Sequence, residues 1–360
     1  MPGYLDRYEI RTPKSRESAL FRDLKGILSV AKARAPGLRR QLAGIDLAQL
    51  KNRADLARIP VLRSAEIARM QSEAPPLGGL AGSRAGAAAR LLASGSSTFV
   101  PEGHAKDWWS AARAMNAAGF ERGDIVLNCH SYHLNAMGRI VESGAHALGC
   151  AVIPAGESEL DRLVKAIARL RPNAYCGQPE FLKNILIRFR QTFDSTASIN
   201  KALFIGAGPS AALEDALRRK AIRVQRCYGK EGVGVIAYQT RLKDGAIADE
   251  MVVNEGIIVE IVKPDTNAPV PFGVVGEVVV TRLNSDYPLL RFATGDLAAL
   301  LPGPSPCGRT NLRFRGGLGR VEHASKQSAE QQAKRAPAGA RRSAQNVRSL
   351  AGRPNESRPD

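Results

Sequence analysis

The segment Arg291–Asp296 ends in a carboxylate that stands where it can bind a sugar. It reads R-F-A-T-G-D, and Asp296 follows a Thr-Gly pair at the end of a short apolar β run. A carboxylate in that place can accept hydrogen bonds from both hydroxyls of a ribose, a two-point contact that is specific for sugar. An ordinary Asp turn is the alternative, and the order of the motifs described below makes it the weaker one.

A run of small hydroxyl residues follows the apolar pair Leu91-Leu92. The run consists of Ser94, Gly95, Ser96, Ser97 and Thr98. Backbone N–H groups and hydroxyls in such a run can wrap an oxyanion such as a phosphate. Taken alone, the run is more commonly a Ser/Gly surface turn.

Two further motifs follow apolar runs that we expect to be strands. The first consists of Gly206, Ala207, Gly208 and Pro209. Ligands of parallel sheets bind at the carboxyl ends of strands, and glycine there lets a flat base approach the backbone. By itself, however, an ordinary strand-to-helix turn is favoured.

The second of these motifs is Tyr228-Gly229-Lys230-Glu231, which follows the expected strand Ile222–Gln225. The ring of Tyr228 can stack on a base, and the carboxylate of Glu231 can hold a Mg²⁺ ion that bridges phosphates. A polar loop explains the motif equally well.

Two histidines flank Ser131-Tyr132 in the segment His130–His133. No cluster of His, Cys, Asp or Glu at metal-ligand spacing accompanies them, so the sequence predicts no metal site there. Tyr132 and His133 can line a substrate pocket. Loop histidines with local hydrogen bonds are an equally good explanation.

Short apolar runs alternate with helical patterns between residues 91 and 245. The runs Ile125–Leu127, Ala151–Ile153, Ala174–Cys176 and Leu203–Ile205 predict buried parallel strands. The segments Asp107–Ala118, Asn135–Leu148, Glu159–Leu170, Glu180–Gln191 and Ala211–Lys220 predict helices between them. Such an alternation predicts a doubly wound α/β sheet.

Changes in composition and in the spacing of apolar residues divide the chain into four regions. Residues 1–90 predict a helical region, and residues 91–245 predict an α/β nucleotide-binding subdomain. Residues 246–326 contain short β runs separated by turns, which predict a small antiparallel β subdomain. Residues 327–360 are basic and almost free of large apolar side chains, so we expect a disordered tail.

Composition narrows the class of protein. The chain has 360 residues, 44% of them hydrophobic, which suffices for one large or two medium domains. No apolar run reaches the roughly 18 residues of a membrane span, so we expect no membrane segment. Five scattered cysteines without a C-x-x-C pair indicate a reduced, cytoplasmic protein. The net charge of +18 attracts anions, but the basic residues are spread along the chain and specific nucleic-acid binding is not expected.

Taken in order, these motifs resemble the adenylate-forming superfamily of AMP-dependent synthetases and ligases, and within it the phenylacetate–CoA ligase-like branch. The resemblance covers roughly residues 40–326. Beyond the motifs above it rests on L-A-R-I-P-V-L (Leu56–Leu62), W-W-S-A-A-R…G-D-I-V (Trp108–Val126), G-C-A-V-I-P-A-G (Gly149–Gly156), C-G-Q-P-E-F-L (Cys176–Leu182), G-E-V-V-V-T-R-L (Gly276–Leu283), Y-P-L-L-R-F-A-T-G-D (Tyr287–Asp296) and S-P-C-G-R-T (Ser305–Thr310).

The resemblance implies the large amino-terminal domain of that fold, with doubly wound, mostly parallel sheets and a small antiparallel β subdomain. It implies ATP-dependent activation of a carboxylic acid, aromatic and phenylacetate-like, through acyl-AMP to a CoA thioester. The expected cofactors and partners are therefore ATP, Mg²⁺, CoA and a small carboxylic acid. A homodimer is left open.

The resemblance also implies a role for each motif. Ser94–Thr98 is then the triphosphate loop, Gly206–Pro209 and Tyr228 hold the adenine, and Asp296 holds the ribose. Arg320 acts at the ribose–phosphate side, Glu231 is the magnesium carboxylate, and Glu322 is the hinge. Tyr132 and His133 belong to the acid-pocket and gating segment.

Three departures from the family pattern lower the expected activity. Thr98 replaces the last glycine of the phosphate loop and no lysine-bearing stretch follows it. Glu231 falls one residue before the family's magnesium carboxylate, whose position is Gly232. Only 34 residues follow Lys326, where the family has a small domain with a catalytic lysine, so we expect a carboxyl-terminally truncated or frame-shifted enzyme. The alternatives are a non-catalytic nucleotide-binding remnant or interaction protein and, more weakly, a nucleic-acid-associated protein.

Overall fold

The computed structural model describes residues 3–95 and 97–321. The chain divides into two units, Met1–Leu318 and Gly319–Asp360, and the fold described below is that of the first. Ser96, Glu322 and the predicted disordered tail 327–360 lie outside the described residues. The predicted subdivision of the chain near residues 90, 245 and 326 stays a prediction.

Helices dominate the first 90 residues, as their apolar spacing predicts. The segments are η1 (Arg7–Ile10), α1 (Pro13–Arg34), α2 (Pro36–Gln41), η2 (Leu47–Gln49), α3 (Arg53–Leu56), α4 (Ser64–Glu73) and η3 (Ala85–Ala87). The hydroxyl of Thr12 caps α1 by accepting the N–H of Ser15. Pro36 ends α1 because a proline cannot continue the hydrogen-bond ladder, and it begins α2 at a helix position where no N–H is required. Ser64 is the first residue of α4, and Arg63 precedes it as the cap residue.

Within the described residues the strands form a two-stranded hairpin and an 11-stranded sheet. The hairpin pairs β1 (Arg90–Ser94) with β2 (Thr98–Glu102). The sheet has the order β10-β11-β12-β13-β9-β8-β7-β6-β5-β3-β4. Its strands are β3 (Ile125–Asn128), β4 (Ala151–Pro154), β5 (Ala174–Cys176), β6 (Lys201–Ile205), β7 (Arg223–Lys230), β8 (Gly234–Arg241), β9 (Ile247–Val253), β10 (Ile257–Val262), β11 (Gly276–Arg282), β12 (Leu289–Leu301) and β13 (Arg313–Arg315).

The pairing changes direction along this sheet. Strands β4, β3, β5, β6 and β7 are parallel neighbours, whereas every pair from β7 to β10 is antiparallel. The predicted α/β fold with a parallel and an antiparallel part is therefore confirmed. The two parts belong to one continuous sheet.

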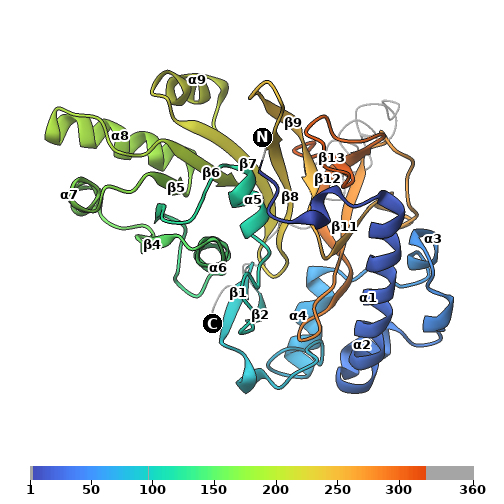
Figure 1. Ribbon diagram of the computed structural model, residues 1–360. Helices are drawn as coiled ribbons and strands as arrows, with labels where there is room; N and C mark the ends of the chain where they lie inside the picture. Colours follow the sequence, from blue (N-terminus) through green and yellow to red (C-terminus); the bar gives the residue numbers. More distant parts are fainter. Residues whose placement is uncertain (1–2, 96, 322–360) are drawn as a thin grey trace, which may run out of the picture. The chain divides into compact units, whose positions relative to one another are not determined.

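Helices cover both faces of the parallel strands. They are α5 (Ala112–Ala117), α6 (Met137–Leu148), α7 (Leu160–Leu170), α8 (Pro179–Phe193) and α9 (Ala211–Arg219). Successive strand residues point to opposite faces, so Val126 joins the core with α5 and α6 while Leu127 joins the core with α7, α8 and α9. Figure 1 shows α8 and α9 on one side of these strands and α6 on the other. The arrangement is doubly wound because these strands carry apolar side chains on both faces of the sheet, and each face must be covered by helices.

Two predicted elements differ from the observed ones. Helix α5 begins at Ala112 rather than Asp107, because the Asp107 carboxylate accepts the backbone N–H groups of Ala111 and Ala112. Burial raises the pKa of Asp107 to about 6. Asp296, which the sequence places at the end of a short β run, lies inside the 13-residue strand β12, where the pairing with β11 is irregular.

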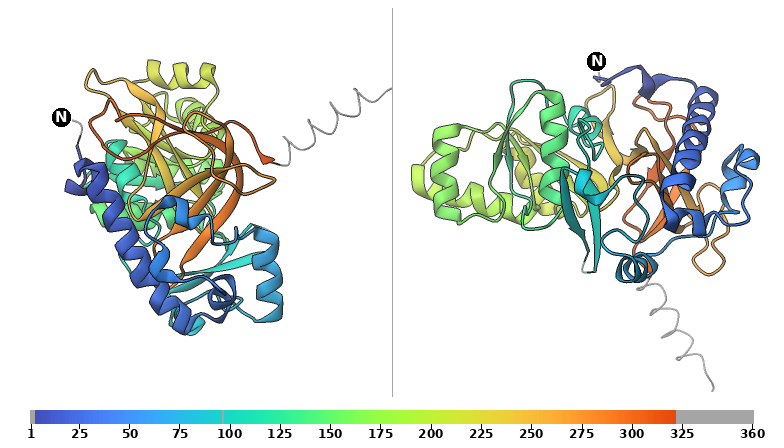
Figure 2. Two further views of the ribbon diagram at one scale, coloured as in Figure 1. Left: turned by 90° about the vertical axis from the view of Figure 1, so that its right-hand side faces the viewer. Right: turned by 90° about the horizontal axis from the view of Figure 1, so that it is seen from below.

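The β1–β2 hairpin stands between the α/β half and the N-terminal helices, as the right-hand view of Figure 2 shows. The side chain of Gln71 in α4 holds β2 through both backbone groups of Phe99. On the other side, Ala93 donates its N–H to the carbonyl of Leu134 at 2.7 Å. The turn between the two strands is thus fixed from both sides.

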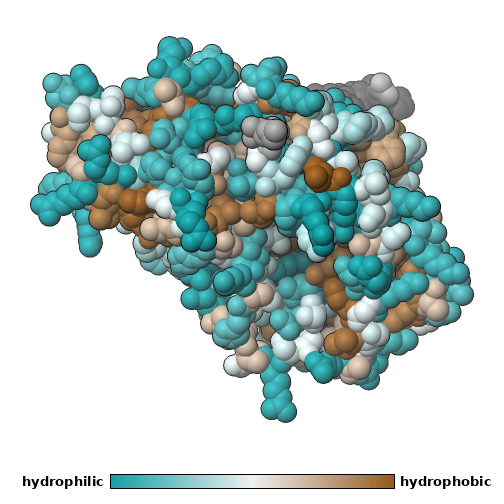
Figure 3. Space-filling model, in the orientation of Figure 1, coloured by the Kyte–Doolittle hydropathy of each residue, from teal (hydrophilic) through white to brown (hydrophobic). Residues whose placement is uncertain are grey.

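The surface is largely hydrophilic on the face that Figure 3 shows, with hydrophobic side chains in small groups. Among the described residues, no helix combines the length and the apolar character that crossing a bilayer requires.

Candidate active site

The turn of the β1–β2 hairpin meets the segment after β7 through a glutamate. The carboxylate of Glu231 accepts the backbone N–H of Gly95 at 2.7 Å and the side-chain amide of Asn135 at 2.5 Å. The Ser94 hydroxyl donates to the backbone carbonyl of Glu231 at 2.9 Å. The predicted phosphate loop and the predicted magnesium carboxylate therefore lie in contact.

Other atoms of the predicted phosphate loop have partners of their own. The Thr98 hydroxyl donates to the backbone carbonyl of Ser94 and closes the turn, which explains a threonine where the family has glycine. Ser97 is exposed, and Gly95 adopts a φ of 68° that favours glycine. Ser96 is the one member of the predicted loop that is not described.

Gly232 occupies the position where the family pattern places the magnesium carboxylate. Its φ is 82°, and a side-chain Cβ there would stand 2.9 Å from the Ser94 Oγ. A longer side chain at 232 would collide with the hairpin, whereas Glu231, one residue earlier, reaches the hairpin with its carboxylate. The shift of one residue noted in the sequence therefore leaves a carboxylate at the phosphate loop.

A second cluster surrounds Asp296. Its Oδ2 accepts the hydroxyl of Tyr228 at 2.8 Å and lies 3.0 Å from the Lys230 ammonium nitrogen. The same ammonium donates to the backbone carbonyl of Thr294 at 2.6 Å. The irregular stretch of β12 positions Asp296 opposite the end of β7, so two residues predicted to bind one nucleotide are in contact.

The predicted adenine-binding residues lie on neighbouring strands. Gly206 follows β6 with a φ of 88°, and its N–H donates to the carbonyl of Cys227 in β7 at 2.9 Å. A Cβ at Gly208 would stand 2.3 Å from the Cδ of Arg226, so a side chain there would displace the outer part of that arginine. The ring of Tyr228 stacks on Phe314 with a centroid distance of 5.5 Å and an angle of 12°.

The predicted acid-pocket segment follows β3. Tyr132 is partly buried, its hydroxyl accepts the amide of Asn128 at 2.7 Å, and burial raises the pKa of the phenol. His133 is exposed and donates its backbone N–H to the Ser131 hydroxyl. The segment continues to Asn135, which binds Glu231, so the acid-pocket loop and the phosphate loop share one carboxylate as a partner.

A buried arginine lies beneath the Glu231-Gly232 turn. Arg282 is 5% exposed, donates to the Trp108 carbonyl at 2.6 Å and approaches the Gly232 carbonyl at 3.5 Å. Its guanidinium lies 5.0 Å from the ring centroid of Trp108 and 5.3 Å from that of Trp109. Burial lowers its pKa to about 10. The cation is held by carbonyls and aromatic faces, which leaves a positive charge below the phosphate loop.

Arg320 and Glu322 belong to the unit that begins at Gly319, of which the structure describes residues up to Val321. The roles that the resemblance gives these two residues stay predictions.

Sequence reasoning assigned no role to Lys230, Asn135 or Arg282. Lys230 stands inside the Tyr228–Glu231 motif. A cation between two expected nucleotide ligands is a pattern that could have indicated a role in the site. Asn135 and Arg282 carried no comparable signal, because their neighbours in space are distant in sequence.

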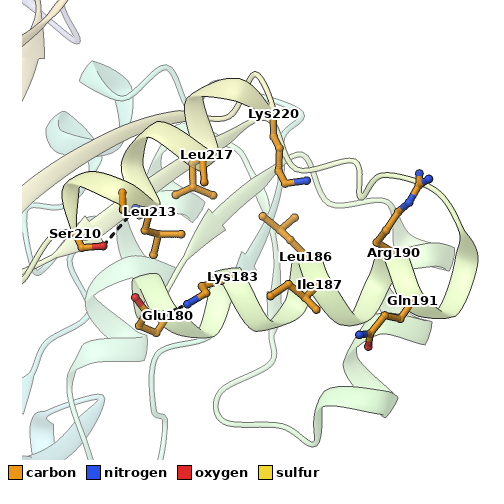
Figure 4. Close-up of a pocket in the computed structure, with 12 residues that line it drawn as sticks. Glu180, Lys183, Leu186, Ile187, Arg190, Gln191, Ser210, Leu213, Leu217 and Lys220 are labelled. Carbon is orange, nitrogen blue, oxygen red and sulfur yellow. Dashed lines mark hydrogen bonds and ion pairs between the residues drawn. The ribbon is translucent and has the colours of Figure 1, made fainter.

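A separate cavity of about 500 Å³ lies between α8 and α9. Figure 4 shows Leu186, Leu213 and Leu217 lining it, with Glu180, Lys183 and Lys220 around them. None of the predicted site residues lines this cavity. The cavity is therefore distinct from the Glu231 and Asp296 clusters.

Within residues 3–95 and 97–321, no group of three or more His, Cys, Asp or Glu side chains is placed to hold a metal ion. A magnesium ion carried by nucleotide phosphates needs only one or two protein carboxylates, and Glu231 fits that need because neutral donors hold it.

Comparison with known proteins identifies the family. The model of the AMP-binding enzyme family matches residues 103–284. A phenylacetate-coenzyme A ligase of Thermus thermophilus is 30% identical over 330 residues, which is 86% of this chain and 72% of that protein. One from Aromatoleum evansii is 28% identical over 317 residues, which is 84% of this chain and 70% of that protein.

A solved structure gives the same answer for the fold. The open conformation of a 2-hydroxyisobutyryl-CoA ligase, in complex with 2-HIB-AMP and CoA, superposes with a TM-score of 0.76 at 25% identity, covering 88% of this chain and 77% of that one. The sequence match and the shared fold agree with the order of motifs along the chain. The chain belongs to the AMP-binding enzyme family of adenylate-forming proteins.

Proposed function

We propose that this chain binds ATP and a carboxylic acid, joins them as an acyl-adenylate and supports transfer of the acyl group to CoA. The observation that carries the proposal is the contact between Glu231 and Gly95 beside the Tyr228–Asp296 pair. It brings groups suited to phosphate, magnesium and ribose to one edge of the sheet, where ligands of such sheets bind. Related proteins named as acid–CoA ligases support the reaction class.

Each group has a role in this reaction. The carboxylate of Asp296 accepts the ribose hydroxyls, and the backbone of Gly206–Pro209 lies beside the adenine. The hairpin turn Ser94–Thr98 holds the β- and γ-phosphates. An oxygen of the substrate acid then bonds to the α-phosphorus while the bond to the bridging oxygen breaks, and pyrophosphate leaves with the electron pair.

Magnesium fits this scheme as an ion that arrives with ATP. Glu231 is the side chain that would hold it, and the ion would neutralise phosphate charge. The two described donors to Glu231, Gly95 and Asn135, are neutral and leave its negative charge for such an ion.

We propose an aromatic acid as the substrate. The curated relatives named as phenylacetate-coenzyme A ligases support this choice, as does the partly buried Tyr132 beside the acid-pocket loop. A small hydroxy acid is the competing class, because the structural relative acts on 2-hydroxyisobutyrate.

We expect slow or undetectable CoA thioester formation by the 360-residue chain alone. The phosphate loop is not followed by a lysine-bearing stretch. Loss of one preorganised donor typically lowers a rate by about 10²–10³. Nucleotide binding depends on other groups and should persist.

Pyrophosphate release with ATP and Mg²⁺, scanned over aryl acids and short hydroxy acids, tests the proposal. Pyrophosphate release that depends on an aryl acid supports the proposal. Release that depends only on hydroxy acids would change the proposed substrate from an aromatic acid to a small hydroxy acid. A chain that binds neither nucleotide nor acid would favour the interaction-protein alternative.

A further inference from the structure

Lys230 is the last residue of β7. None of the roles proposed above involves its positive charge. The ammonium has two described acceptors, the Thr294 carbonyl at 2.6 Å and the Asp296 carboxylate at 3.0 Å. A lysine ammonium carries three N–H donors. The side chain keeps 25% of its surface exposed. A third donor is therefore available to a ligand that reaches this edge of the sheet.

The two ends of the proposed nucleotide site flank this ammonium. Asp296, which would take the ribose, is its ion-pair partner. Glu231 follows Lys230 in the chain and binds Gly95 of the hairpin that would take the outer phosphates. In ATP the α-phosphate stands between the ribose and those phosphates. A nucleotide that spans both ends must therefore pass its α-phosphate across Lys230.

We propose that Lys230 binds the α-phosphate of the nucleotide and is a catalytic residue of adenylate formation in this chain. The inference rests on the proposed function, because it uses the ribose and phosphate ends assigned there. As the acid oxygen bonds to the α-phosphorus and pyrophosphate leaves, charge redistributes over the phosphate oxygens. A fixed ammonium stabilises that charge without reorganisation. Lys230 transfers no proton in this step.

A structural role is the competing explanation. Lys230 would then only neutralise Asp296 and hold it in place for the ribose. The two explanations differ in the part of the nucleotide that they affect. A phosphate contact changes the binding of AMP but spares adenosine, whereas misplacement of Asp296 weakens both ligands alike.

Calorimetric binding of AMP and adenosine to the full chain and to Lys230→Met separates them. Loss of a charge-assisted contact should weaken AMP binding by about tenfold or more, with adenosine binding changed by less than about twofold. Lys230→Arg should retain most of the AMP affinity. Lys243→Met removes a lysine from the exposed loop after β8 and serves as the matched control for lost charge.

Equal weakening of AMP and adenosine, or an unchanged AMP affinity, overturns the role of Lys230 and leaves the proposed function standing. If the parent chain binds neither ligand, the proposed function itself fails. Should Lys230→Met lose its fold, the comparison of AMP with adenosine is made on Lys230→Gln and Lys230→Arg.

Discussion

Two glutamates of this chain accept hydrogen bonds of similar length from donors of different kinds. Glu9 is fully buried and accepts the Arg309 Nε at 2.6 Å and the Tyr238 hydroxyl at 2.7 Å. Glu231 is half-buried, and its described partners are the neutral donors Gly95 and Asn135. One carboxylate is neutralised by a buried cation, and the other keeps its charge available.

The difference distinguishes a carboxylate that stabilises the fold from one that suits the binding of a ligand. A carboxylate buried without water needs an opposite charge, and Glu9 with Arg309 ties η1 to the loop before β13. A carboxylate held by neutral donors can exchange them for a cation at low cost. The carboxylate of Glu231 therefore suits a ligand site, whereas that of Glu9 suits the stability of the fold.

The largest expected effect is on the structural carboxylate. Glu9→Gln keeps the shape of the side chain but leaves the buried Arg309 without its counter-ion, which should lower the free energy of unfolding by about 3–5 kcal/mol. Urea denaturation measures it. Glu73→Gln, in an exposed ion pair with Arg69, is the control and should change stability by less than about 1 kcal/mol. A similar small change for Glu9→Gln would contradict the contrast between the two glutamates.

Glu231→Gln should show the opposite pattern. Stability should stay within about 1 kcal/mol of the parent, because the amide can still meet neutral partners. Pyrophosphate release in the presence of Mg²⁺ should fall by about 10²-fold, since a charge-stabilising group is lost. Parallel denaturation and activity measurements check both halves. An unchanged magnesium dependence would remove Glu231 from the metal role.

His130 gives a smaller effect that depends on pH. It is 4% exposed, its Nε2 has no partner among the described residues, and burial lowers its pKa to about 4. The unfolded chain binds a proton near the ordinary pKa of about 6.5, so stability falls as pH falls from that value towards 4. Between pH 7 and pH 5 the parent should lose about 2 kcal/mol more than His130→Asn.

Asp107 must be considered in that measurement because its contribution has the opposite sign. Its raised pKa of about 6 means that the folded chain binds the proton first, so acid stabilises the fold as pH falls from about 6 towards the ordinary pKa. Subtracting the curve of His130→Asn from that of the parent cancels this contribution. A difference that stays flat between pH 7 and pH 5 would show that His130 is not buried as a neutral base.

Local pattern was enough to predict much of the fold. The predicted strand Ala174–Cys176 matches β5 to the residue, because it is an apolar run bounded by polar or turn residues. The expectation that the β run ends at Asp296 was wrong for the opposite reason. Irregular pairing of β12 with β11 accommodates the glycine, and pairing between strands is invisible in a local window.

The motifs of the candidate site stand out in the sequence, whereas the contacts between them do not. The order of motifs along the chain drew attention to Ser94, Glu231 and Asp296. The role of Asn135 depends on a contact 96 residues away in sequence, which no spacing rule describes. The contact of Glu231 with Gly95 likewise joins residues that are 136 positions apart in the chain.

Calorimetric binding of AMP to the parent chain and to Asp296→Ala tests the central claim most directly. The claim is that the edge of the sheet where Tyr228 meets Asp296 binds the nucleotide. The account predicts binding by the parent and a loss of about 1.5–3 kcal/mol in the variant, because a charge-assisted contact to the ribose is removed. Equal affinity of the two proteins for AMP would contradict it.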